Sequence, residues 1–173
     1  MIRWLPNLVS LLRLLLTIPY FLWLSKSPFS QEVVLLALII TLSDKIDGFL
    51  ARKLKVTSKL GEVLDSFADS VFFVGTWILF FIKNLISLGF FIGFLIPRAI
   101  VLISLCIFYL RKKRWSNKHF IGNKITGVTH FMAILWFLLE FPGSELVLML
   151  ALIVGCIAAL WSEYERHSQK IGM

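Results

Sequence analysis

Four aspartates, the only ones in the chain, are the residues whose type and spacing could do chemistry together. Asp44 and Asp47 are three residues apart, and Asp65 and Asp69 are four apart, so each pair shares one face of a helix. Both pairs lie near the ends of apolar segments that are joined by a short linker, residues 52–60. We therefore expect two antiparallel neighbouring helices whose carboxylates face each other across one cleft.

Carboxylates gathered in this way would repel one another and take up protons unless cations neutralise them. Hard oxygen ligands with no nearby histidine or cysteine favour Mg²⁺ or Mn²⁺ over zinc. Four carboxylates suit two ions roughly 4 Å apart, the arrangement used in phosphoryl transfer. Three small residues, Gly48, Ala51 and Gly61, lie on or next to the aspartate faces and leave room for a ligand against the backbone. The pattern predicts a two-metal site suited to phosphoryl transfer.

The aspartates belong to a longer string of fixed residues. Residues 44–69 read D-K-I-D-G-F-L-A-R-K-L-K-V-T-S-K-L-G-E-V-L-D-S-F-A-D. They match D-x2-D-G-x2-A-R-x8-G-x3-D-x3-D at every fixed position, including the gap between Arg52 and Gly61. This string closely resembles the signature of the CDP-alcohol phosphatidyltransferase family, whose members transfer a phosphatidyl group from a CDP-linked lipid to an alcohol and release CMP.

The resemblance implies a role for each fixed residue. Two Mg²⁺ or Mn²⁺ ions would be held against the CDP diphosphate by the four aspartates, Asp44, Asp47, Asp65 and Asp69. Asp69, the last of them, would also act as the general base that takes the proton of the acceptor hydroxyl. Gly48, Ala51 and Gly61 would accept the cytidine, and Arg52 would help to hold the diphosphate. Catalysis would then need positioning, charge neutralisation and one base, without a covalent intermediate.

Basic residues outside the motif are candidates for binding the acceptor. Arg98 follows Pro97 inside an apolar segment, where an arginine needs an anion or water. It resembles the arginine that phosphatidylglycerophosphate synthases place before an acidic residue in their fourth helix, although Ala99 follows it here. Arg98 is interpreted either as a ligand of an acceptor phosphate or as a structural or snorkelling residue. Lys59 and Arg111 are further acceptor candidates.

Two other polar features lie in or before apolar segments. Asn7, Ser10 and Arg13 are spaced i, i+3, i+6, which is similar to the N-x-x-[ST]-x-x-R stretch of glycerophosphate-type members of the family. The alternative interpretation is a polar helix start with a snorkelling arginine. His130 is expected to be a buried polar contact rather than a ligand.

The elements that must position these residues are membrane helices. The 173 residues are 58% hydrophobic and 16% charged, with a mean hydropathy of +0.86, whereas soluble domains are roughly 25% charged. This composition excludes an ordinary soluble protein and a disordered one, and two cysteines exclude a disulfide scaffold. We predict an all-α integral membrane protein, a single domain over residues 1–173, with six transmembrane helices at about 5–24, 32–52, 61–82, 86–110, 121–141 and 145–162.

The basic residues indicate how these helices are oriented. Thirteen lysines and arginines fall on one side of the predicted bundle, and only Lys26 and Lys83 fall on the other. Because basic residues concentrate in cytoplasmic loops, both termini and the aspartate site are expected to face the cytoplasm. The net charge of +8 is attributed to this topology, to anionic lipid headgroups and to phosphate-bearing substrates rather than to nucleic acid.

The identity of the acceptor is left partly open. Basic residues at the predicted cleft favour a phosphorylated alcohol, with glycerol 3-phosphate as the first choice. Phosphatidylglycerol (giving cardiolipin), inositol phosphate and serine are alternatives within the same chemistry. A small metal-ion transporter is a remote alternative from another class, but it would have no use for the small residues beside the aspartates. The resemblance also implies CDP-diacylglycerol as the donor, membrane lipids as surroundings and a homodimer.

Overall fold

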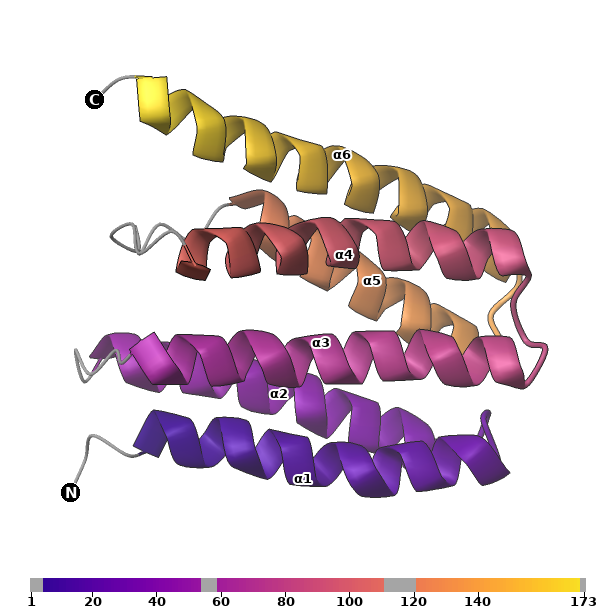
Figure 1. Cartoon of the computed structure of the whole chain (residues 1–173). Coiled ribbons are helices and arrows are strands. Elements are labelled where there is room, and N and C mark those ends of the chain that lie inside the picture. Colours follow the sequence, from indigo (N-terminus) through magenta and orange to yellow (C-terminus); the bar gives the residue numbers. More distant parts are fainter. Residues whose placement is uncertain (1–4, 54–58, 111–120, 172–173) are drawn as a thin grey trace. The chain divides into compact units, whose positions relative to one another are not determined.

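The computed structural model describes residues 5–53, 59–110 and 121–171, and within these ranges the chain forms six helices and no strand (Figure 1). Side chains are described for residues 10–43, 67–100, 103, 125–161 and 164. The helices are α1 (Leu5–Lys26), α2 (Gln31–Lys53), α3 (Lys59–Ile82), α4 (Leu88–Leu110), α5 (Ile121–Leu138) and α6 (Ser144–Ile171). The all-helical prediction is confirmed for this part of the chain, and eleven of the twelve predicted helix ends lie within three residues of those observed.

The C-terminal ends of α5 and α6 differ from the ends predicted from hydropathy. α5 stops at Leu138, before its predicted end at 141, because Glu140 adopts a left-handed conformation with φ of 53°. The backbone N–H of Phe141 then donates to the carbonyl of Trp136 at 3.4 Å, which closes the last turn. α6 continues nine residues past its predicted end because its polar tail contains no glycine or proline before Gly172.

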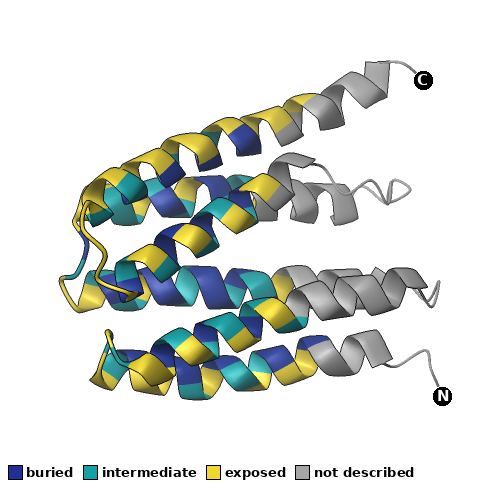
Figure 2. Cartoon of the chain, turned by 180° about the vertical axis from the view of Figure 1, so that it is seen from behind, coloured by how far each residue is buried: buried dark blue, intermediate teal, exposed yellow. Residues whose placement is uncertain are grey.

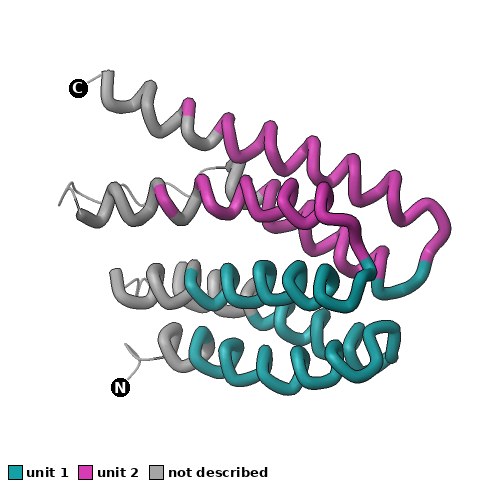
Figure 3. The backbone as a smooth tube through the Cα atoms, turned by 45° about the vertical axis from the view of Figure 1, so that its right-hand side comes forward, with its two compact units in different colours: residues 1–85, 138–140 teal, residues 86–137, 141–173 magenta. Residues whose placement is uncertain are grey.

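The chain divides into two compact units (Figure 3). Unit 1 comprises residues 1–85 and 138–140, and unit 2 comprises residues 86–137 and 141–173. In unit 1, α1 packs against both α2 and α3, and in unit 2, α4 packs against α6. The turn at residues 27–30 joins α1 to α2, so these two packed helices run antiparallel.

Helix α1 has a buried side and an exposed side (Figure 2), and its buried side chains are mostly polar. Its buried side chains recur every three or four residues and form one stripe: Ser10, Arg13, Thr17, Tyr20 and Leu24. Its exposed side chains are large and apolar: Leu11, Leu12, Leu15, Ile18, Leu22 and Trp23. A surface helix of a soluble protein has the opposite pattern, with its apolar stripe facing the core.

Helices α1 and α3 are joined by two polar bridges. The side chain of Arg13 bonds to Asp69, and the hydroxyls of Tyr20 and Thr76 share a hydrogen bond at 3.2 Å. Both residue numbers increase from the first bridge to the second, so α1 and α3 run parallel. Gly75 permits the close approach, since a Cβ at this position would collide with the ring of Phe21.

Among the described residues, one stretch is both long and apolar enough to cross a membrane by itself, Ser144–Trp161 of α6. Only 28% of that stretch is buried, unlike the core helix of a soluble protein. Four other helices contain shorter apolar stretches, which are Gln31–Ser43, Phe67–Ile82, Leu88–Ile100 and Ile125–Leu138.

Candidate active site

The backbone brings the two halves of the aspartate motif to one end of unit 1. Asp44 and Asp47 belong to the C-terminal part of α2, and Asp65 and Asp69 belong to the first half of α3. Because α2 is antiparallel to α1 and α3 is parallel to it, these two segments lie at the same end of the unit.

Most side chains of the predicted site lie outside the described residues. They are those of Asp44, Asp47, Gly48, Ala51, Arg52, Lys59, Gly61 and Asp65, and also those of Asn7 and Arg111. Their predicted roles therefore stay predictions. The described members are Ser10, Arg13, Asp69 and Arg98.

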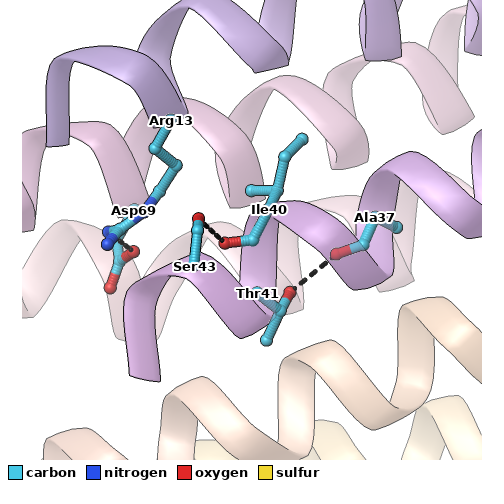
Figure 4. A network of polar contacts seen from close by, with 6 residues as sticks. All are labelled: Arg13, Ala37, Ile40, Thr41, Ser43 and Asp69. Atoms are coloured by element: carbon cyan, nitrogen blue, oxygen red, sulfur yellow. Dashed lines mark hydrogen bonds and ion pairs between the residues drawn. The ribbon is translucent and has the colours of Figure 1, made fainter. Parts of the chain in front are cut away.

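Asp69 forms an ion pair with Arg13 across the α1–α3 interface (Figure 4). The Nη1 group of Arg13 donates to Oδ1 of Asp69 at 3.0 Å. The arginine side chain is fully buried, whereas 34% of the aspartate side chain is exposed. The interpretation of Arg13 as a snorkelling residue is therefore wrong, because its guanidinium points into the helix interface and binds a carboxylate there.

Asp69 is partly exposed although several residues beside it are buried. Its neighbours Ala68 and Ser70 on α3 are buried, and so is Ser10 on α1. A carboxylate in this position combines a fixed partner on one side with access for a ligand on the other. That combination suits a group that must keep one orientation and still exchange a proton with a substrate.

The hydroxyls of α2 nearest the motif are engaged with their own helix (Figure 4). Ser43 donates to the carbonyl of Ile40 at 2.7 Å, and Thr41 donates to the carbonyl of Ala37 at 2.9 Å. Such back-bonding satisfies a hydroxyl inside an apolar helix. The hydroxyl protons of Ser43 and Thr41 are therefore already engaged within α2.

Arg98 lies on α4 in unit 2. The helix α4 continues through Pro97, which is buried, and the side chain of Arg98 is half-buried. His130 of α5 is fully buried and stacks edge-on against Phe94 of α4, with ring centroids 5.0 Å apart. A Cβ at Gly155 would lie 3.0 Å from Nε2 of His130, so this glycine leaves room for the imidazole. The prediction that His130 is a buried polar residue is confirmed.

The pairing of Arg13 with Asp69 was not predicted from the sequence. Two signals pointed toward it: an arginine inside an apolar segment, and polar residues at three- and four-residue spacing along α1. A metal centre cannot be assembled from the described side chains alone, since they include no group of three or more His, Cys, Asp or Glu residues suited to hold an ion. Asp69 contributes carboxylate oxygens, which are the donors that Mg²⁺ and Mn²⁺ prefer.

Known proteins resemble this chain over most of its length. The model of the family described as CDP-alcohol phosphatidyltransferase matches residues 3–161. The CDP-diacylglycerol--glycerol-3-phosphate 3-phosphatidyltransferase of Aquifex aeolicus is 38% identical over 124 residues, which cover 70% of this chain and 68% of the relative. The cardiolipin synthase (CMP-forming) of Streptomyces coelicolor is 30% identical over 162 residues, which cover 90% of this chain and 74% of the relative.

A third similarity is shorter. A protein of Pectobacterium atrosepticum with the same name as the Aquifex relative is 42% identical over 69 residues, which cover 38% of this chain and 37% of that protein. The match to the family model includes α1, the whole aspartate motif and Arg98. The chain belongs to the CDP-alcohol phosphatidyltransferase family.

Proposed function

We propose that this protein transfers the phosphatidyl group of CDP-diacylglycerol to sn-glycerol 3-phosphate and releases CMP, the activity of a phosphatidylglycerophosphate synthase. The reaction class follows from family membership. The observation that carries the choice of acceptor is the 38% identity to a relative whose name specifies glycerol 3-phosphate.

In the proposed reaction, Asp69 accepts the proton of the acceptor hydroxyl as that oxygen attacks the phosphorus bonded to CMP. Two Mg²⁺ or Mn²⁺ ions, held by Asp44, Asp47, Asp65 and Asp69, would neutralise the diphosphate and make CMP a better leaving group. Arg52 would hold the diphosphate, while Gly48, Ala51 and Gly61 would accept the cytidine. The partial exposure of Asp69 supports its part, since a base must reach the proton that it abstracts.

The proposed setting is a multi-pass membrane domain formed by the whole chain, with its active site and both termini in the cytoplasm. The outward-facing leucines of α1 and the low burial of Ser144–Trp161 support contact with lipid. The uneven distribution of basic residues supports the orientation. Membrane lipids, and a second copy of the chain by analogy with the family, complete the proposed partners.

The acceptor can be tested directly with purified protein and CDP-diacylglycerol in mixed micelles. CMP release and lipid products are measured with glycerol 3-phosphate, glycerol, phosphatidylglycerol, inositol phosphate and serine. We expect glycerol 3-phosphate to give phosphatidylglycerophosphate and to outcompete glycerol, because only the former carries an anionic phosphate. Turnover with phosphatidylglycerol and none with glycerol 3-phosphate would overturn the choice of acceptor but not the reaction class.

A variant of Arg98 identifies the acceptor side of the site in the same assay. A charge-assisted hydrogen bond contributes about 1.5–3 kcal/mol, so Arg98→Ala should lower kcat/KM for glycerol 3-phosphate by about 10- to 150-fold. The KM for the CDP-lipid should barely change, and Arg98→Lys should recover only part of the loss, since lysine lacks the planar fork. Lys83→Ala, which removes an exposed basic residue, is the matched control. Equal damage to both substrates would make Arg98 a structural residue, and Lys59 and Arg111 would become the leading acceptor candidates.

Cardiolipin synthesis is the second candidate. The relative from Streptomyces coelicolor, whose name specifies that activity, aligns with 90% of this chain. In that case the acceptor hydroxyl belongs to phosphatidylglycerol, and the products are cardiolipin and CMP. The product lipid in the assay above distinguishes the two candidates.

A further inference from the structure

The setting of Arg13 is unusual for a charged side chain. Arginine is almost never fully buried unless it is paired, and Arg13 is 0% exposed. Its Nη1 lies 3.0 Å from Oδ1 of Asp69, and the two residues are 56 positions apart in the sequence. An ion pair of this kind fixes the direction of a carboxylate, because the bond is strong and both ends are anchored in packed helices.

The two ends of this pair differ in access. The aspartate is 34% exposed and the arginine is not exposed at all. A ligand that reaches Asp69 from solvent therefore meets the carboxylate and not the guanidinium behind it. A contact of Arg13 with a substrate at this position would therefore be made through the carboxylate.

We propose that Arg13 is a positioning residue for Asp69: it holds Oδ1 from the α1 side and so keeps the carboxylate in the orientation that accepts the proton of the acceptor hydroxyl. This inference rests on the proposed function and names one more residue of its machinery. It also explains why a fully buried arginine is tolerated in the interface between α1 and α3. The guanidinium reaches across the helix interface and brings a charge that a neutral side chain could not supply.

The test is a double-mutant cycle on kcat, measured per folded molecule. A misplaced reacting group costs up to about 100-fold in rate, so Arg13→Met should lower kcat by about 10- to 100-fold and change both KM values little. In an Asp69→Asn background, where the base is already absent, Arg13→Met should lower kcat by less than about twofold. Arg13→Lys keeps the charge without the planar fork and should recover part of the loss.

Tyr20→Phe provides the matched control, because Tyr20 lies two turns further along the same buried face of α1 and also bonds to α3. It should leave kcat unchanged, alone and in the Asp69→Asn background. Should Arg13→Met not fold, Arg13→Lys and the charge-free double variant Arg13→Met/Asp69→Asn still report the coupling against Asp69→Asn alone.

Three results would overturn the inference. Equal losses from the Arg13 variants in both backgrounds would show that Arg13 does not act through Asp69. A lower melting temperature with normal kcat would make Arg13 purely structural. Absence of CMP release by the wild-type protein with every acceptor would instead remove the proposed function, and the positioning role would fall with it.

Discussion

The two polar bridges between α1 and α3 join residues with the same sequence separation, but one is an ion pair and the other is a hydrogen bond between hydroxyls. Arg13–Asp69 is charged and open to solvent on the aspartate side, whereas Tyr20–Thr76 is neutral and closed, with both residues fully buried. Each bridge joins residues 56 apart, and the bridges are seven residues, or two helical turns, apart. The same packing of two parallel helices thus presents a partly exposed carboxylate at one position and a fully buried contact at the other.

The Tyr20–Thr76 bridge, the closed one, is a purely structural hydrogen bond of this interface. The hydroxyl of Thr76 also bonds to the carbonyl of Phe72 at 2.7 Å, so the polar atoms are satisfied among themselves. Tyr20 packs against Phe72 with ring centroids 5.1 Å apart, which excludes a ligand from the bridge. In the Arg13–Asp69 bridge, by contrast, 34% of the aspartate side chain is exposed, as the proposed role of Asp69 as a base requires.

The largest expected difference between the two ends is their dependence on metal. If the aspartate end holds divalent cations, excess EDTA should abolish CMP release, and added Mg²⁺ or Mn²⁺ should restore it. Neither Tyr20 nor Thr76 carries a carboxylate that could bind a cation, so the helical content measured by circular dichroism should stay constant during chelation. Undiminished turnover in excess EDTA would rule out a two-metal site.

The next largest effect is expected from Asp69→Asn, which keeps the size of the side chain but cannot take up the proton. Loss of a general base costs at least about 100-fold in turnover, while binding of the CDP-lipid should survive in part. Thr76→Val, a change of similar size two turns along α3, is the control and should leave kcat unchanged. Near-normal activity of Asp69→Asn would assign the base to another residue and leave family membership unaffected.

The smallest effect is expected at the closed bridge. Tyr20→Phe removes one hydrogen bond but leaves the Thr76 hydroxyl bonded to the Phe72 carbonyl, so no buried donor loses its acceptor. A loss of about 0.5–1.5 kcal/mol in unfolding free energy should follow, visible as a lower melting temperature in detergent. A fall in kcat as large as that of Arg13→Lys would erase the distinction between the two bridges.

Much of this architecture could be predicted from local patterns. Apolar runs separated by short polar gaps gave six helices, since helix formation depends on neighbouring residues along the chain. The ends of α5 and α6 were predicted less accurately. Hydropathy reveals neither the left-handed conformation of Glu140 nor the helical conformation of the polar tail. The metal site and the roles of Asp44, Asp47 and Asp65 come from the spacing of the motif and from family resemblance, and they stay predictions.

The sequence by itself determined the family of this protein and the pattern from which its chemistry is predicted: which carboxylates lie on one helix face and which small residues accompany them. Only the tertiary structure decided that Arg13 serves Asp69 rather than the membrane surface. The periodicity of a helix fixes which side chains share a face, but it says nothing of the register of one helix against another. In this register, α1 and α3 run parallel and each residue of α1 lies beside the residue of α3 that is 56 positions later. The guanidinium of Arg13 therefore lies beside the carboxylate of Asp69.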